Sequence, residues 1–125
     1  MSVGFFLLAL LGGGVGASLR FVIDGLIMRR VHNGYPVGTF VINSTGALLL
    51  GFLTGLSDSS VLDAQWLFVL GGGLMGGYTT FSTAMLDTVH MLQKRTYGRA
   101  LINGLVMIVV TVILALIGLL VGRAM

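Results

Sequence analysis

The chain contains no cysteine, and its two histidines, His32 and His90, are far apart in the sequence. Without cysteine there can be no disulfides and no thiolate metal sites, and two scattered histidines do not supply the ligands of an ordinary zinc site. Disulfide-stabilised folds and zinc enzymes are therefore excluded.

Charge is also scarce. Only 9% of the 125 residues are charged, whereas 56% are hydrophobic, and the mean hydropathy is +1.04. A water-soluble fold of this composition would lack the polar surface needed to cover itself. The formal charge of +3 does not indicate nucleic-acid binding, because the basic residues lie mostly in short segments between apolar runs. The composition predicts an all-α integral membrane protein.

Apolar runs of near-membrane length predict the domain organisation. A bilayer core takes about 20 apolar residues per helix, and four stretches approach that length, at about 3–28, 39–56, 66–86 and 100–121. We predict one four-helix membrane domain over residues 1–125, with nothing left for a soluble domain. No basic residue precedes the first run and no clear cleavage site follows it, so we expect no removable signal peptide. So small a bundle has little room for a hydrated path, which predicts an oligomer.

The basic residues predict the orientation. With four spans, the first and third connections face one side and both termini face the other. The basic residues on the first side are Arg29, Arg30, Lys94, Arg95 and Arg99, against Arg123 alone on the second. The positive-inside rule then places the first and third connections in the cytoplasm and the termini outside, in a plasma membrane of bacterial type.

Glycines spaced four apart predict close helix packing. The chain has 20 glycines, and the spaced pairs are Gly12 and Gly16, Gly51 and Gly55, Gly72 and Gly76, Gly73 and Gly77, and Gly118 and Gly122. Such pairs let helix backbones approach where lipid provides no hydrophobic drive for association.

Two polar residues within the apolar runs have more than one interpretation. Arg20 could extend to the headgroups, draw anions into a vestibule, or pair with Asp24 one helical turn later. Asn43 could bridge neighbouring helices or direct its amide donors at a permeating anion.

The densest polar group lies in the third run, where "GGYTTFST" places five hydroxyls in the six positions 78–83. Glycines followed by hydroxyl side chains favour local unwinding over a regular helix. Freed carbonyls at such a break commonly hold a cation, while hydroxyls and helix N-termini favour an anion. The sequence therefore predicts a broken third helix, whose hydroxyls serve either the break or an ion pathway.

The segments "GGGVGASLRF", "GTFVINSTGALLLGF" and "GGGLMGGYTTFSTAMLD" occur in this order and resemble the Fluc, or CrcB, family of fluoride channels over nearly the whole chain. The resemblance implies a channel for passive fluoride export rather than an enzyme. It also implies an antiparallel, dual-topology type of dimer in the membrane lipid, with two pores at the subunit interface. A structural sodium ion would lie at the dimer centre, held by backbone carbonyls of Gly76 and Thr79.

The resemblance also assigns residues to the pore. Asn43 matches the pore asparagine, Phe81 the first phenylalanine of an aromatic box, and Arg20 the vestibule arginine. The remaining matches are the hydroxyl motif of Thr80, Ser82 and Thr83 and, on the last helix, a polar track at Asn103, Met107 and Thr111.

Two positions depart from the family pattern. The second box phenylalanine is Ala84, and Met107, within the polar track, cannot donate a hydrogen bond. A homodimer of antiparallel subunits requires insertion in both orientations, which the charge bias opposes. We therefore hypothesise that the partner is a paralogous subunit inserted the opposite way, with one of the two pores vestigial.

Two other functions remain as alternatives. A small multidrug transporter of four helices would exchange protons for cations at a carboxylate in mid-helix, but this chain has no glutamate, and Asp24 lies near the end of the first run. The second alternative is a non-conducting subunit that only packs against a channel-forming partner.

Overall fold

The computed structural model describes residues 2–32 and 36–125, apart from the side chains of residues 82 and 83, and every regular element in these ranges is helical. The long helices are α1 (Val3–Met28), α2 (Val37–Asp58) and α6 (Tyr97–Ala124). Between α2 and α6 lie α3 (Ala64–Leu67), the π-helix η1 (Phe68–Met75), α4 (Gly76–Tyr78) and α5 (Phe81–Gln93). The predicted all-α class is confirmed for the described residues, and α1, α2 and α6 are each long and apolar enough to cross a membrane.

The three long helices match three of the four predicted spans or extend beyond them. The fourth predicted span, at 66–86, is divided among α3, η1, α4 and α5. The first run and α1 have the same bounds, whereas α2 and α6 each extend two or three residues further at both ends than the apolar runs at 39–56 and 100–121. Hydropathy marks only the residues suited to the hydrocarbon core, while backbone hydrogen bonds continue the helix into the polar interface.

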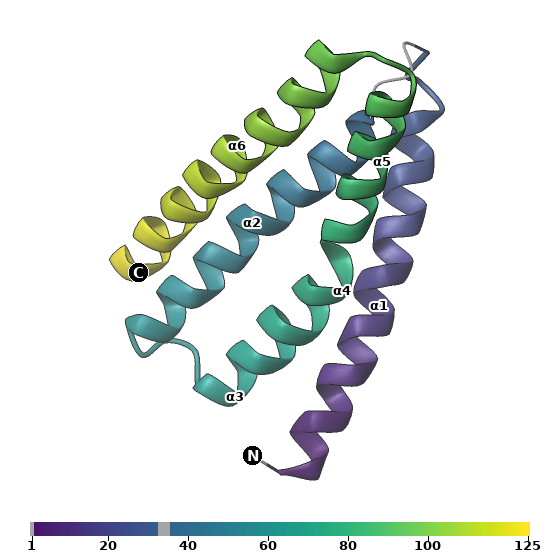
Figure 1. Cartoon of the computed structure of the whole chain (residues 1–125). Helices are drawn as coiled ribbons and strands as arrows, with labels where there is room; N and C mark the ends of the chain where they lie inside the picture. The colour runs from purple at the N-terminus through teal and green to yellow at the C-terminus, as the bar shows by residue number, and fades with distance from the viewer. Residues whose placement is uncertain (1, 33–35) are drawn as a thin grey trace.

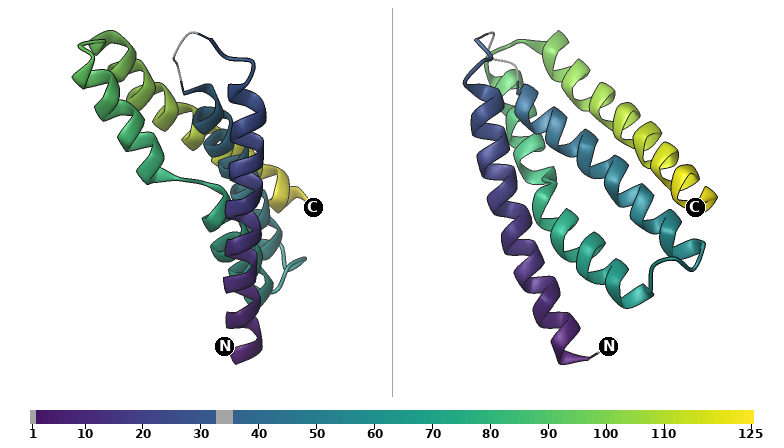
Figure 2. Two further views of the ribbon diagram at one scale, coloured as in Figure 1. Left: turned by 90° about the vertical axis from the view of Figure 1, so that its right-hand side faces the viewer. Right: turned by 180° about the vertical axis from the view of Figure 1, so that it is seen from behind.

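The bundle consists of two pairs of helices (Figure 1). In one pair α1 runs beside η1 and α4, and in the other α2 runs beside α6 (Figures 1 and 2). Both pairs are parallel, because residues that meet advance together along the chain: Gly51 with Ala115 and Gly55 with Leu119, for example. Beyond α4 the chain leaves α1, and α5 packs mainly against α6 (Figure 2, left).

Backbone contact at glycine holds each pair together. A Cβ atom added to Gly51 or Gly55 would collide with carbonyl oxygens of α6, and one added to Gly118 or Gly122 would collide with carbonyl oxygens of α2. The same applies between α1 and the η1–α4 segment at Gly16, Gly73 and Gly77, and Gly12 has backbone atoms of that segment at 3.2 Å. One predicted pair has no helix neighbour within the described part of this chain: a Cβ atom added to Gly72 would have only the Phe68 ring within 4 Å, and one added to Gly76 only the carbonyl of Gly71 at 3.9 Å.

The helical path of the third segment is interrupted at the hydroxyl cluster. α4 ends at Tyr78, Thr79 is extended (φ −81°, ψ 158°), and α5 begins at Phe81. Thr79 directs both its N–H and its hydroxyl to the carbonyl of Met75, each at 2.9 Å, which closes the preceding turn. The irregularity begins earlier, because the glycine-rich segment Phe68–Met75 winds as a π-helix.

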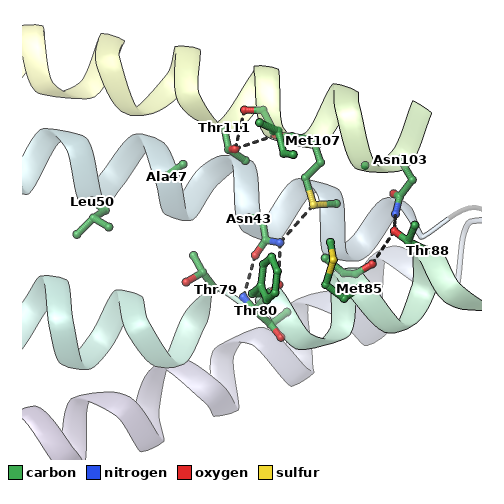
Figure 3. A pocket seen from close by; sticks show the side chains of 14 residues that line it. Asn43, Ala47, Leu50, Thr79, Thr80, Met85, Thr88, Asn103, Met107 and Thr111 are labelled. Carbon is green, nitrogen blue, oxygen red and sulfur yellow. Dashed lines mark hydrogen bonds between the residues drawn. The ribbon is translucent and has the colours of Figure 1, made fainter. Parts of the chain in front are cut away.

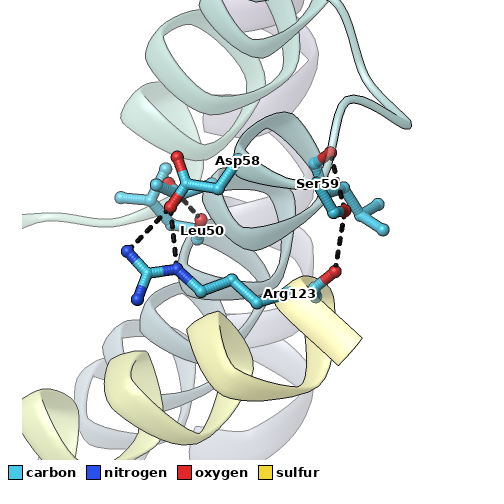
Figure 4. Close-up of polar contacts among 7 residues, drawn as sticks. Leu50, Asp58, Ser59 and Arg123 are labelled. Atoms are coloured by element: carbon cyan, nitrogen blue, oxygen red, sulfur yellow. Dashed lines mark hydrogen bonds and ion pairs between the residues drawn. The ribbon is translucent and has the colours of Figure 1, made fainter. Parts of the chain in front are cut away.

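A polar clasp joins the ends of α2 and α6 (Figure 4). Arg123 lies 2.9 Å from the carboxylate of Asp58, and the hydroxyl of Ser59 donates to the carbonyl of Gly122 at 3.2 Å. The basic residue that the sequence assigns to the side of the termini is therefore neutralised by a neighbouring aspartate.

Candidate functional site at the helix break

A pocket of about 320 Å³ lies between α2, the break, α5 and α6 (Figure 3). Five of the residues assigned to the pore from the sequence line it: Asn43, Thr80, Phe81, Asn103 and Thr111. Ala84 and Met107, the two departures from the family pattern, line it as well. The side chains of Ser82 and Thr83 lie outside the described part of the chain. Positions far apart in the sequence thus converge beside the break.

Asn43 pairs with the backbone at the break. Its Oδ1 accepts the N–H of Thr80 at 2.8 Å, and its Nδ2 donates to the carbonyl of Thr80 at 2.9 Å. A helix end has backbone groups without intrahelical partners, and unpaired groups are costly at membrane depth. One amide therefore satisfies both polar groups of an interrupted backbone. Asn43 bridges two elements, and it also lines the pocket, so the two interpretations of this residue are compatible.

Further contacts from α2 hold the break in place. Thr45 Oγ1 lies 2.9 Å from the carbonyl of Val41 and 2.9 Å from the hydroxyl of Tyr78, and either hydroxyl can donate in the second contact. Tyr78 is buried, and Gly46 lies against Thr79 Cγ2 and the Tyr78 ring. From the sequence we predict a role for Asn43 but not for Thr45, Gly46 or Tyr78. Gly46, the small residue that follows "NST", is the one sequence feature that indicates a close contact here.

The aromatic and apolar lining is uneven. Phe81 is 76% exposed at the first position of α5, so most of its ring has no partner within this chain. Ala84 and Met107 are buried, at 2% and 7% exposure. A second aromatic ring at position 84 would therefore have to displace neighbouring atoms.

Several polar side chains of the pocket use their donors within the chain. Thr88 donates to the carbonyl of Ala84, and Thr111 to the carbonyl of Met107. Asn103 Nδ2 donates to Thr88 Oγ1 at 2.8 Å, while its Oδ1 is buried without a hydrogen-bond partner. As oriented, the α5 and α6 walls present acceptors more readily than donors.

Arg20 lies elsewhere, in a second cavity of about 330 Å³ that Asp24, Thr39 and Thr80 also line. Its Nε atom is buried without a hydrogen-bond partner. No ion pair joins Arg20 and Asp24 in the described part of the chain, so the pairing considered from the sequence is wrong. Thr80 lines both cavities and is the residue they share.

A carboxylate midway along α5 makes an interhelical bond: Asp87 Oδ2 accepts the hydroxyl of Thr39 at 3.2 Å. Since Thr39 lines the Arg20 cavity, this bond connects that cavity with the helix that follows the break.

Long apolar helices around a polar interruption define a small membrane protein with a site suited to ions. Comparison with known proteins then supplies the family. The family described as CrcB-like protein, Camphor Resistance (CrcB), matches residues 7–122. The chain belongs to this CrcB-like family, which confirms the resemblance inferred from its motifs.

Several relatives cover most of the chain. Fluoride-specific ion channel FluC 1 of Leifsonia xyli subsp. xyli is 41% identical over 112 residues, 90% of this chain and 82% of the relative. Fluoride-specific ion channel FluC 2 of Mycobacterium tuberculosis (strain ATCC 25618 / H37Rv) is 41% identical over 123 residues, 98% of this chain and 91% of the relative. Fluoride-specific ion channel FluC of Pyrococcus abyssi is 34% identical over 124 residues, 98% of this chain and 99% of the relative.

Proposed function

We propose that the chain is a subunit of a fluoride channel that exports cytoplasmic fluoride passively, and that it is not an enzyme. The observation that carries the proposal is the convergence of Asn43, Thr80 and Phe81 on one pocket at the helix break. Relatives that span nearly the whole chain are named fluoride-specific ion channels, which supports the same ion here.

The chemistry of fluoride agrees with these residue types. Fluoride is small and strongly hydrated, so a pore must replace its water with strong donors, and amide and hydroxyl groups provide them. An aromatic ring adds the positive edge of its quadrupole. Hydrogen fluoride enters as a neutral acid and dissociates in the cytoplasm, and the trapped anion then leaves down its gradient.

The proposed channel subunit crosses the membrane four times, with Ala64–Gln93 as a broken third span. The 15 residues of α3, η1 and α4 extend about 20 Å and the 13 of α5 about 20 Å. Either half alone is too short for a hydrocarbon core of about 30 Å, whereas both together suffice. The basic connections would face the cytoplasm and both termini the outside of a bacterial-type cell membrane.

The functional unit is an antiparallel dimer in lipid, with two pores along its interface and no nucleic-acid partner. The exposure of Phe81 supports a dimer, because a large aromatic ring beside a polar pocket lacks a partner within one chain.

A structural sodium ion at the dimer centre is part of the proposal. The N–H of Thr80 donates to Asn43, so it is unavailable to the carbonyl of Gly76 four residues earlier. A carbonyl freed in this way suits a hard cation, and Gly76 and Thr79 would supply such oxygens from both subunits. The ion would neutralise the ends of interrupted helices and hold the two breaks together.

The test is fluoride efflux from liposomes containing the purified protein, followed with a fluoride-selective electrode. We expect fluoride to leave when a potassium ionophore balances the charge, and chloride to be retained. Absence of fluoride efflux from this chain, alone and with any paralogous subunit from the same genome, would refute the proposal.

A partly vestigial or non-conducting subunit of a heterodimer is the second candidate, favoured by Met107 and Ala84 in the pocket lining. The excess of basic residues in the first and third connections opposes dual insertion and favours the same candidate. Robust efflux by this chain alone would end that candidate. A multidrug antiporter lacks support, because no carboxylate is among the residues that line the pocket in the described part of the chain.

A further inference from the structure

Both amide protons of Asn43 have acceptors within the chain. Nδ2 donates to the carbonyl of Thr80 at 2.9 Å and also lies 3.5 Å from Sδ of Met107 (Figure 3). The first contact belongs to the helix break. The second points into the pocket, where Met107 is 7% exposed.

The two acceptors differ in strength. A backbone carbonyl is a strong acceptor, whereas a thioether sulfur is a weak one. Fluoride would be a far better partner than sulfur for the proton directed at Met107, but the methionine side chain fills the space that the anion would need. An unbranched methionine adapts to such a gap readily.

The neighbouring walls offer little substitute. The hydroxyl donors of Thr88 and Thr111 and one of the two protons of Asn103 Nδ2 are directed at partners within the chain. The buried Oδ1 of Asn103 is an acceptor and would repel an anion. The Asn43 proton covered by Met107 is therefore the donor that lies directly beside position 107.

We infer that Met107 is the residue that closes this chain's own pocket to fluoride: its sulfur holds the second amide proton of Asn43, and its side chain occupies the adjacent volume. The inference rests on the proposed function and deepens it, since it names the residue that sets permeability. An open track requires a small hydroxyl at position 107, which would leave space and supply a donor.

The experiment compares fluoride efflux from liposomes for the wild type, Met107→Ser, Met107→Leu and Met91→Ser. Met91 is a matched control, since it is another methionine with 7% exposure but lies outside the Asn43 pocket. We expect Met107→Ser to raise the rate about tenfold or more, the effect of gaining one good hydrogen bond to an anion. Met107→Leu keeps the bulk but removes the sulfur acceptor, so its rate should rise less than that of Met107→Ser. Met91→Ser should stay at the wild-type rate.

A binding measurement separates this inference from the proposed function. The side-chain amide resonances of Asn43, identified by their absence in Asn43→Gln, are followed by NMR during titration with sodium fluoride and with sodium chloride. Fluoride-specific shifts in Met107→Ser and none in the wild type support the inference even where no variant transports fluoride, an outcome that would refute channel function alone.

Three outcomes would overturn the inference. The first is wild-type efflux that Met107→Ser does not increase, which leaves the channel function intact. The second is an equal increase in Met107→Leu or Met91→Ser, which would indicate general loosening. The third is the absence of both transport and Asn43 shifts in Met107→Ser.

Discussion

The helices are held together differently in the half of the bundle near both chain termini and in the layer around the break. Near the termini, backbone lies directly on backbone, and the Cβ-free surfaces of Gly51 and Gly118 leave no space between α2 and α6. At the break, the amide of Asn43 satisfies the backbone of Thr80, and a pocket of about 320 Å³ remains beside it.

The difference separates the roles of the two regions. Contact at glycine is dense and makes no use of polar side chains, so it provides a rigid frame in lipid. A break held by side-chain hydrogen bonds leaves polar groups next to a cavity, which is tolerated at membrane depth only where protein encloses it. The glycine contacts between the helices form the rigid frame of the bundle, and the polar groups that line the pocket lie at the break.

The largest effect is expected from Asn43→Leu. It removes the two hydrogen bonds that Asn43 makes with the N–H and the carbonyl of Thr80, each worth about 1–3 kcal/mol, and it removes the amide from the pocket. Fluoride efflux should be lost and the thermal midpoint in detergent should fall, measured by the electrode assay and by far-UV circular dichroism.

The control is Thr54→Val on the same helix, since the hydroxyl of Thr54 donates only to the carbonyl of Leu50 one turn earlier. We expect both readouts to stay near wild type. If Asn43→Leu were as stable and active as the control, the break would not depend on this amide.

The next largest effect tests the glycine frame. In Gly118→Ala the added methyl group would meet the carbonyl oxygen of Leu48 and the nitrogen of Phe52, so α2 and α6 must separate. Overpacking of this kind costs about 1–3 kcal/mol, visible as a lower thermal midpoint. Gly104→Ala is the matched control on α6: a Cβ there has nothing within 4 Å, and alanine favours the helix. Equal midpoints for the two variants would contradict tight packing of α2 on α6.

A smaller effect is expected at the junction of the two regions. Tyr78→Phe removes the hydroxyl that is hydrogen-bonded to Thr45, a contact worth about 1 kcal/mol. A double-mutant cycle with Thr45→Val, read from thermal midpoints, should show that the two losses are not additive. Tyr97→Phe, at a residue 62% exposed, is the control. Additive losses would mean that the contact between Tyr78 and Thr45 carries no coupling energy.

The smallest effect is expected at the clasp between Asp58 and Arg123, whose side chains are 43% and 55% exposed. Ion pairs this exposed are worth less than about 1 kcal/mol and weaken as salt screens them. Asp58→Asn should lower the thermal midpoint slightly at low salt and not at high salt. Asp63→Asn, at a residue with no ion pair among the described residues, should change neither value. A loss comparable to that of Gly118→Ala would show that the clasp belongs to the frame.

Much of the fold could be predicted from the sequence, because long apolar runs and repeated glycines are local signals. The bounds of α1 and the close approach at Gly51 and Gly118 follow from such signals. The pair Gly72 and Gly76 has no helix neighbour within the described chain, because spacing shows that two glycines share a helix face but not that another helix lies against it. Likewise, Arg20 and Asp24 are one turn apart, yet they form no ion pair.

Within the candidate site, the sequence identified residue types but not their partners. Asn43 and Thr80 are 37 positions apart, and nothing local indicates that one amide takes both backbone groups of a single residue. The contact between Asn43 and Met107 spans 64 positions and depends on the parallel packing of α2 and α6.

The amino-acid sequence by itself determined that this protein is helical and apolar, that its glycines allow close contact, and that its polar residues gather near one interruption. These features depend on local backbone geometry and on the free energy of transferring side chains into lipid, and composition and spacing specify both. Only the tertiary structure decided which amide meets which backbone group and which side chain fills the remaining space. Those pairings arise when helices from distant parts of the chain come within hydrogen-bonding distance.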